Sequence, residues 1–357
     1  MKSIGKTVSA IYALSLAVAI WGCSHKSGGD QGFVFHDRLS QYGFFEGDLP
    51  ALRPAEGVVS YELNTPLFTD YARKARFIKV PDRQSATAKN GELVFPDGTV
   101  LIKNFFYHRD ESDTAMGRHI IETRLLVKQG SRWKVATYIW DDGQKEAYKE
   151  MLGATKLVKW TDRHGAPREI DYVVPDNNDC KSCHKKGGEI SPIGPKIANL
   201  NKVVSTGKKT MNQLELLTSK GIIKQVGPTD RLPHLPVWDD SLQYTLNERA
   251  RAYLDVNCGH CHNSAGPANN TGLFLEYEQQ DHFRLGICKG PVSAAQGSGN
   301  LKYDVVPGHP EASILYYRMN TTAPGIAMPE LGRTVVHTEG VGLIKAWIES
   351  LDGEGCD

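Results

Sequence analysis

Cys180-Lys181-Ser182-Cys183-His184 is followed further along the chain by Cys258-Gly259-His260-Cys261-His262, a second copy of the same five-residue pattern. Two cysteines three positions apart lie on neighbouring faces of one helical turn, so both thiols can add to the vinyl groups on one edge of a porphyrin. The histidine that follows can bind the iron. The pattern predicts two covalently bound haem c groups, with thioether bonds and iron ligands supplied by Cys180, Cys183, His184, Cys258, Cys261 and His262.

Three other uses of paired cysteines fit the sequence less well. A zinc ribbon needs four thiolates from pairs about 15–20 residues apart, and the two pairs here are much further apart. A thioredoxin-like dithiol needs a βαβ context and no histidine after the second cysteine. A disulfide framework is typical of small domains, whereas 357 residues can bury a large core without it.

The N-terminus predicts export. Lys2 and Lys6 precede the apolar stretch 10–21, which is shorter than the roughly 20 residues of a membrane span, so residues 1–22 are expected to be a signal peptide. The segment ends Ala19-Ile20-Trp21-Gly22-Cys23 and resembles a bacterial lipobox, in which Cys23 is lipidated. Trp21 replaces the usual small residue, which leaves ordinary cleavage near Gly22 as the alternative.

A lipidated Cys23 would anchor the protein to a membrane, with residues 23–32 as a flexible linker. Ser24 in place of Asp after this cysteine favours the outer membrane. Haem is joined to c-type cytochromes outside the cytoplasm, so the periplasmic side is the expected location. A net charge of +1 gives no field suited to nucleic acid, and no nucleic-acid partner is expected.

Seven cysteines are present, and the haems and the lipid account for five of them. Cys288 and Cys356 remain. In an oxidising compartment we expect them to form a disulfide that ties the C-terminal tail to the body, the alternative being two free thiols.

Residues 33–174 read as strands separated by turns. Pro96-Asp97-Gly98 lies between two apolar runs and favours a hairpin between them. In the stretch 133–140 the side chains alternate with a period of two, as expected for a strand with one buried face. A β-rich sandwich or partial barrel is therefore expected over these residues.

From residue 175 the composition changes to helices and glycine-containing loops. A short helix is expected over 212–220, and Thr245-Leu246-Asn247-Glu248 matches a capping box that starts another. A third helix follows from the apolar stripe Ile344, Trp347, Ile348 and Leu351. We expect an α+β multidomain chain in which the mainly α part comprises a first haem-binding region, 175–244, and a second haem-binding domain, 245–357.

Weaker candidates lie in the β-rich part. Asp110, Glu111 and Asp113 beside His108 could bind a cation or an oligosaccharide, although such clusters are more often solvated. Aromatic side chains could form a sugar-stacking platform, although aromatic residues in strands are more often core. These aromatic residues are Trp133, Tyr138, Trp140 and Trp160.

The stretch 253–262 and the later Met328-Pro329-Glu330-Leu331-Gly332 resemble a class I cytochrome c domain. This resemblance implies that Met328 is the sixth iron ligand of the second haem. Met319 is a rival, and Met328 could instead fill a gap in the core. Gly194-Pro195 resembles the glycine-proline pair whose carbonyl orients the iron-binding histidine, or it is a plain turn.

The chain from about residue 43 to 350 also resembles a bacterial family of two-haem c-type cytochromes with a β-rich N-terminal region. The matching stretches are 43–45, 61–70, 95–99, 192–196 and 272–275. The resemblance implies electron transfer and names no substrate, and it suggests a parallel β-helix protein as a partner. The sixth ligand of the first haem is left open between Met211, His234 and an open position.

The leading interpretation is an electron carrier that relays single electrons between periplasmic or membrane redox partner proteins. The alternatives are a dihaem peroxidase or oxidase with one open iron, or a β-region that binds a ligand while the haems carry electrons away. Bacterial dihaem peroxidases place their motifs further apart, which favours the carrier.

Overall fold

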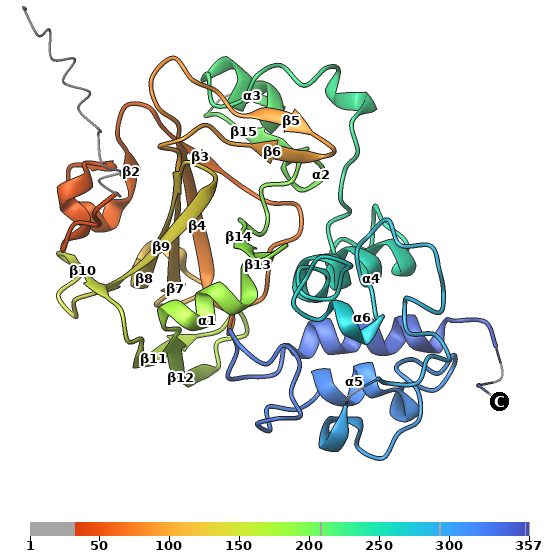
Figure 1. Ribbon diagram of the computed structural model, residues 1–357. Helices are drawn as coiled ribbons and strands as arrows, with labels where there is room; N and C mark the ends of the chain where they lie inside the picture. Colours follow the sequence, from red (N-terminus) through yellow and green to blue (C-terminus); the bar gives the residue numbers. More distant parts are fainter. Residues whose placement is uncertain (1–32, 208, 293, 354, 357) are drawn as a thin grey trace, which may run out of the picture. The chain divides into compact units, whose positions relative to one another are not determined.

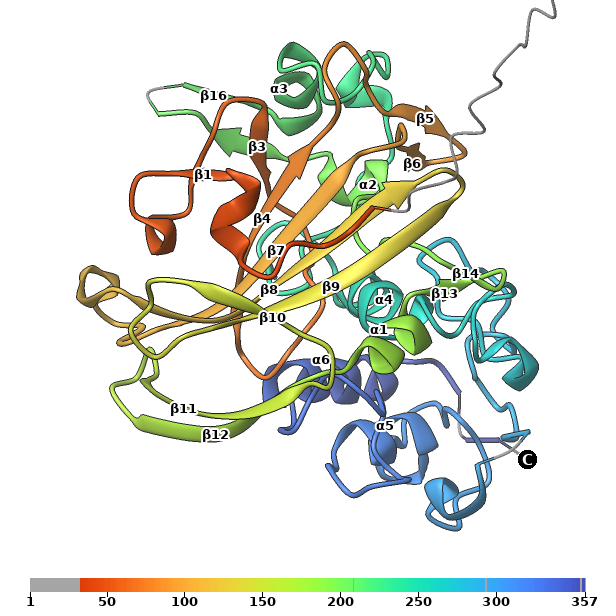
Figure 2. The same ribbon diagram turned by 60° about the vertical axis from the view of Figure 1, so that its left-hand side comes forward.

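A six-stranded sheet forms the centre of the β-rich half in the computed structural model (Figures 1 and 2). The strand order is β10-β9-β8-β7-β4-β3, and all neighbouring strands are antiparallel. The strands are β3 (Val58–Tyr61), β4 (Arg73–Lys79), β7 (Val100–His108), β8 (Arg118–Gln129), β9 (Arg132–Trp140) and β10 (Ala147–Glu150). The structure describes residues 33–356 apart from 208, 293 and 354. The expected signal peptide, the linker 23–32 and the lipidation site Cys23 lie outside the described residues.

Within the part of the chain that the structure describes, five two-stranded ribbons accompany the sheet. They are β1–β2 (Phe45–Glu46 and Arg53–Pro54), β5–β6 (Thr87–Lys89 and Glu92–Val94), β11–β12 (Ala154–Thr161 and Pro167–Val174), β13–β14 (Lys185–Lys186 and Glu189–Ile190) and β15–β16 (Val203–Ser205 and Thr210–Asn212). The β11–β12 ribbon packs on one face of the sheet, where Val158, Trp160 and Tyr172 contact Phe105 and Tyr107. This ribbon gives a second layer over part of one face, and the main sheet is an open meander rather than a barrel.

Two details of the β-rich half differ from the sequence-based expectation. The segments that flank Pro96-Asp97-Gly98 do not pair with each other, because β6 pairs with β5 and β7 pairs with β4 and β8. The carboxylate of Asp97 instead accepts a hydrogen bond from the Gly130 N–H at the β8–β9 turn. In β9 the alternation fails after Val135, because the N-terminal segment covers the second face: the Tyr138 hydroxyl bonds to Tyr42.

Helices follow the sheet and carry the two cysteine motifs. They are α1 (Asn177–Cys183), α2 (Ile197–Leu200), α3 (Gln213–Ser219), α4 (Leu246–Leu254), α5 (Ile314–Met319) and α6 (Thr338–Glu349). The expected capping box of Thr245 and Glu248 starts α4. The expected apolar stripe of α6 is buried: Ile344, Trp347 and Ile348 are at most 1 % exposed and pack with α4. Burying each such side chain contributes about 1.5–3 kcal/mol.

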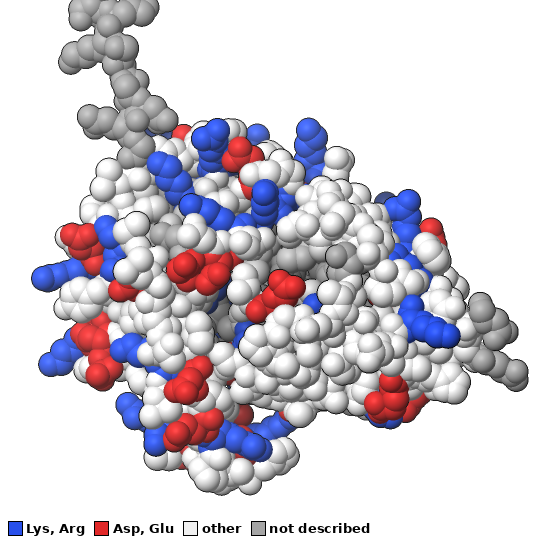
Figure 3. All heavy atoms as spheres, turned by 60° about the horizontal axis from the view of Figure 1, so that its bottom comes forward, with Lys and Arg blue, Asp and Glu red and all other residues white. Residues whose placement is uncertain are grey.

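The expected mixture of α and β structure is confirmed, but residues 175–357 are not mainly helical. In their described part, short helices alternate with two ribbons, single helical turns and loops. Residues 35–357 form one compact unit. The division of its second half into haem-binding regions at 175–244 and 245–357 stays a prediction. On the face shown in Figure 3, acidic and basic side chains are interspersed. Within the described residues, no helix has the length and apolar character needed to cross a bilayer.

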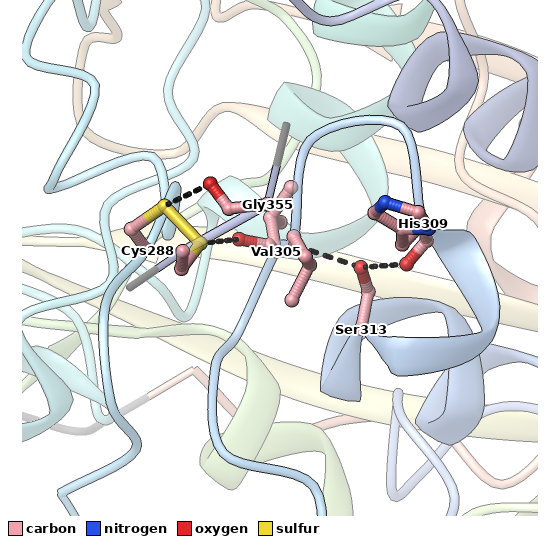
Figure 4. The surroundings of a disulfide bond; sticks show 7 residues. Cys288, Val305, His309, Ser313 and Gly355 are labelled. Atoms are coloured by element: carbon pink, nitrogen blue, oxygen red, sulfur yellow. Dashed lines mark hydrogen bonds between the residues drawn. A yellow bond between two sulfur atoms is a disulfide. The ribbon is translucent and has the colours of Figure 1, made fainter. Parts of the chain in front are cut away.

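A disulfide holds the C-terminal end against the body of the unit (Figure 4). Cys288 and Cys356 are bonded, with their Cα atoms 5.3 Å apart. The Sγ of Cys356 lies 3.9 Å from the carbonyl oxygen of Val305, and the Sγ of Cys288 lies 3.8 Å from that of Gly355. The bond closes a loop of 68 residues that includes α5 and α6.

Replacing both cysteines, as in Cys288→Ser/Cys356→Ser, should lower the free energy of unfolding. In the chain-entropy model a loop of this size contributes about 4 kcal/mol, and measured losses for native disulfides are about 2–5 kcal/mol. Denaturant unfolding would measure the change. A reductant should destabilise the unmodified chain to the same level and leave the double variant unaffected. Equal stability of the two proteins without reductant would contradict the prediction.

Candidate functional site

Helix α1 presents the first cysteine pair. The carboxylate of Asp176 caps its N-terminus by accepting hydrogen bonds from the N–H groups of Asn178 and Asp179, at 2.6 and 2.8 Å. Cys180 is buried, Cys183 is half-buried, and both thiols are free. Burial raises the pKa of both thiols. The helical turn therefore offers two protonated thiols on adjacent faces.

His184 ends α1 with its ring held in one orientation. Its N–H donates to the carbonyl oxygen of Cys180 at 3.0 Å, and its Nδ1 lies 2.9 Å from the carbonyl oxygen of Ser191. Burial lowers the pKa of His184 to about 3, so the ring is neutral and Nδ1 carries the proton. Nε2 then keeps a lone pair for a metal. A backbone carbonyl does orient this ring, but it belongs to Ser191 and not to Pro195 as the resemblance implied.

The second pair follows α4 without a break in the helical backbone. One turn of π-helix, Asp255–Gly259, carries Cys258, and the N–H groups of Cys261 and His262 donate to the Cys258 carbonyl at 3.0 and 2.9 Å. Burial raises the pKa of Cys258 and Cys261 to about 12. Burial also lowers the pKa of His262 to about 4, so this imidazole is neutral.

Both motifs have the chemistry that a covalently bound haem requires. Each supplies two unpaired thiols and one neutral imidazole within a single turn of backbone. Among the described residues, no group of three or more His, Cys, Asp or Glu side chains is arranged as a separate ion site. The donor set of each motif fits haem c.

The two motifs lie against each other although they are far apart in the sequence. The N–H of Gly187, three residues after His184, donates to the carbonyl oxygen of Ala265 at 3.0 Å. After burial, the neighbouring Cys183 is the next cause that raises the pKa of Cys261. Two sites that each hold a redox group would therefore be neighbours.

A cavity of about 290 Å³ lies where the two motifs meet the end of the sheet. His184 and Cys183 line it from the first motif, and His260 lines it from the second. The Nδ1 of His260 lies 3.2 Å from the carbonyl oxygen of Val256. Nothing in the motif pattern singles out His260, because it occupies a variable position of the motif. Its proximity to His184 appears only in the fold.

Met328 lies in a loop that one guanidinium holds in place. Nη2 of Arg333 donates to the carbonyl oxygens of Thr321 and Met328 at 2.7 and 2.9 Å, and also lies 3.3 Å from that of Arg318. The Met328 side chain is half-buried. By contrast, Met319 is 5 % exposed and belongs to the core cluster of α4 and α6. Arg333 was not singled out from the sequence, and it fixes the backbone of the proposed ligand loop.

The other candidates lie elsewhere or have structural partners. Met211 is in the β15–β16 ribbon, and His234 is exposed with Nε2 2.8 Å from the Tyr244 hydroxyl. Neither lines the cavity beside His184.

The weaker candidates of the β-rich part have structural partners. The carboxylate of Asp110 accepts hydrogen bonds within its own turn, and Glu111 pairs with Arg73. The four aromatic side chains considered as a sugar-stacking platform are at most 8 % exposed, so they are core residues, the interpretation that the sequence favoured.

A strap, residues 64–70, connects both motif-bearing segments to the sheet. The Thr65 N–H donates to the side chain of Asn199 at 2.9 Å, and the Phe68 N–H donates to the side chain of Asn257 at 2.8 Å, one residue before Cys258. At its end, the Asp70 carboxylate accepts hydrogen bonds from Thr334 N–H at 2.7 Å and Val335 N–H at 3.1 Å. From the sequence, these residues were noted only as part of 61–70, one of the stretches that resemble the two-haem cytochrome family. That resemblance assigned no structural role to them.

His337 lies between the strap and α4 and contacts both. Its ring stacks on Phe68 with ring centroids 4.0 Å apart, and its Nδ1 lies 2.9 Å from the Tyr253 hydroxyl. Burial lowers its pKa to about 4, although Glu339 acts in the opposite direction. The folded protein therefore disfavours the protonated ring.

The free energy of unfolding should fall by about 2 kcal/mol between about pH 7 and pH 5 because of His337. The unfolded ring takes up a proton near pH 6.5 and the folded ring only near pH 4, so stability present above pH 6.5 is lost as the pH falls. Urea unfolding at several pH values would show a smaller pH dependence in His337→Gln. The matched control His234→Gln should keep the pH dependence of the parent; an unchanged profile in His337→Gln would refute the assignment.

Known family models, curated proteins and solved structures were compared with this chain, and none of them matches it. What the site does is therefore inferred from its own residues: two pairs of free thiols, two neutral imidazoles, and the backbone hydrogen bond between the loops that follow the two motifs.

Proposed function

We propose that this chain is an exported two-haem c-type cytochrome that transfers single electrons between redox partner proteins. The observation that carries the proposal is the proximity of two Cys-x-x-Cys-His motifs, whose following loops are joined by the hydrogen bond from Gly187 to Ala265. Electron transfer between two centres becomes faster as they come closer. A chain that folds to bring two such motifs together is therefore suited to relay electrons.

Each motif would hold one haem in the same way. Cys180 and Cys183 would form thioether bonds to the first haem and Cys258 and Cys261 to the second, with His184 and His262 as iron ligands. A bound haem supplies a one-electron redox change at its iron. The chain keeps both imidazoles neutral by burial, and it orients His184 through the Ser191 carbonyl.

Met328 is the proposed sixth ligand of the second haem. Its loop is held by Arg333, and its N–H donates to the carbonyl oxygen of Arg318 at 2.9 Å. The charge of Arg318 also acts on the pKa of His262, which places this segment near the second imidazole. A methionine opposite a histidine raises the reduction potential of a haem. The packing of α6 on α4 supports a cytochrome c-like arrangement for residues 245–357.

The cellular setting is also part of the proposal. Cleavage after residue 22 and lipidation of Cys23 would place the protein on the periplasmic side, anchored to the outer membrane. Its partners there would be redox proteins, and a parallel β-helix protein is one of the expected partners.

A dihaem peroxidase or oxidase is the second candidate, and one observation favours it. Neither Met211 nor His234 lines the cavity beside His184, so neither provides an evident sixth ligand for the first haem. The spin state of the oxidised protein separates the two functions. Two low-spin six-coordinate irons indicate a carrier, and a high-spin iron that reacts rapidly with peroxide indicates an enzyme.

A pyridine haemochrome assay should find two covalently bound haems for each chain. The variant Cys180→Ala/Cys183→Ala should retain one, and Cys258→Ala/Cys261→Ala should also retain one, because each pair attaches its own haem. The matched control Cys288→Ser/Cys356→Ser also removes two cysteines and should keep both haems. Two haems in either motif variant, or no haem in the parent chain, would reject the proposed function.

Met328→Leu should abolish the long-wavelength absorption band typical of methionine-bound ferric haem and lower the reduction potential of one haem. Met319→Leu makes the same chemical change in the buried core and should retain the band. A redox titration with optical detection measures both effects. Loss of the band in Met319→Leu, with the band kept in Met328→Leu, would show that Met319 and not Met328 is the ligand.

A further inference from the structure

One face of the sheet carries a row of positive charges beside the first motif. We name Lys74, Arg76, Lys103 and Arg124 the cationic stripe; these residues lie on β4, β7 and β8. Arg76 is directly opposite Lys103, and Lys103 is directly opposite Arg124. Like charges directly opposite each other destabilise an antiparallel sheet. Three neighbouring strands therefore bear an unfavourable arrangement unless an anion offsets it.

The described residues offset this charge only in part. Glu122 forms an ion pair with Arg124 and accepts a hydrogen bond from the Tyr172 hydroxyl at 2.6 Å. Lys74 donates to the carbonyl oxygen of Leu67 at 3.0 Å, which brings no negative charge. The described residues provide no hydrogen-bond or ion-pair partner for the guanidinium of Arg76 or the ammonium of Lys103.

Three of the four cations surround a single aromatic ring. The side-chain charges of Lys74, Lys103 and Arg124 lie 5.9, 4.8 and 4.4 Å from the centroid of Phe105, which is fully buried. The face of an aromatic ring attracts cations through its quadrupole, but it carries no net charge. Phe105 therefore gathers the cations without neutralising them. Among the described residues, Glu122 is the one carboxylate that forms an ion pair with the stripe, while the charges of Asp70 and Glu62 act on Lys74 and Arg76 without a hydrogen bond or ion pair.

The stripe begins next to the first cysteine pair. Helix α1 packs on β9 and crosses the lower part of the sheet in Figure 1. The charge of Arg124 acts on the pKa of Cys180, and Arg124 is directly opposite Thr137 of β9. From there the stripe continues over β8 and β7 to β4. Adjacent strands are about 4.8 Å apart, so the distance from β9 to β4 is about 14 Å.

Burial and repulsion by neighbouring cations disfavour the protonated forms of the two lysines of the stripe. The pKa of Lys74 and that of Lys103 are lowered well below their ordinary value, first by burial and next by neighbouring cations. An anion in contact with these groups would oppose both effects, because a nearby negative charge favours the protonated amine. The stripe is therefore suited to a ligand that carries more than one negative charge.

We propose that the cationic stripe binds the two propionate carboxylates of the first haem. The inference rests on the proposed function, because it requires a haem attached at Cys180 and Cys183. The propionates leave the macrocycle at the edge opposite the two thioether bonds, and the stripe extends away from the strand on which α1 packs. Arg76 offers the planar fork that matches a carboxylate, and Lys103 offers a compact point charge.

Redox titration of the holoprotein tests the proposal with Lys103→Met, Arg76→Met and their combination. A cation near a haem favours the reduced state, so its removal should shift the potential of one haem to lower values and leave the other unchanged. The control Lys134→Met makes the same charge change on exposed residue 134 of β9, and it should shift neither haem. Arg76→Lys and Lys103→Arg keep the charge and should show smaller shifts than the methionine variants.

The outcomes separate this inference from the proposed function. A purified parent chain with fewer than two haems would reject the proposed function itself. Two haems in every protein, with the double variant titrating like Lys134→Met, would overturn only the role of the stripe. A change in the parent's potentials on adding phosphate at constant ionic strength would also overturn it, because the stripe would then be open to external anions. If Arg76→Met does not accumulate, Lys103→Met alone decides the question.

Discussion

The buried polar groups of the strap, residues 64–70, are the interaction on which the arrangement of both motifs depends. Thr65 is bonded to Asn199, Phe68 to Asn257, and Asp70 to the backbone at Thr334 and Val335. A buried polar group without a partner costs about 1–3 kcal/mol, so these groups strongly favour one mutual position of the segments that they join. That position brings the loop after His184 to the loop after His262, and every proposal about electron relay requires this contact.

Local signals in the sequence predicted the elements that form with little help from distant residues. The capping box at Thr245, the apolar stripe of α6 and the strand β9 all appear where the residues indicated them. The hairpin predicted around Pro96-Asp97-Gly98 was wrong because β4 and β8 occupy the two edges of β7. The residues of a turn do not show which strands its neighbours will pair with. The buried second face of β9 also depends on residues almost a hundred positions away, such as Tyr42.

In the candidate site, too, local patterns were predictable from the sequence and contacts between distant residues were not. The four motif cysteines and the two histidines were visible because their spacing is a local property of one helical turn. The Ser191 carbonyl, His260 in the shared cavity, and the guanidinium of Arg333 were not, because each acquires its position from the way separate loops meet. The cationic stripe shows the limit most clearly: its residues are ordinary lysines and arginines in sequence, and only the strand register places them side by side.

The joined pair Cys288–Cys356 imposes an order of events on biogenesis. Under the proposed function, four thiols of the same chain must stay reduced until the porphyrins are attached, while two others must be oxidised in the same compartment. Thiolates attack disulfides, so an early bond between neighbouring motif cysteines would block maturation. Because Cys356 follows both motifs in the sequence, its bond to Cys288 cannot close before both motifs have emerged. Formation of this disulfide therefore suits a late stage of maturation, after both haems have been attached.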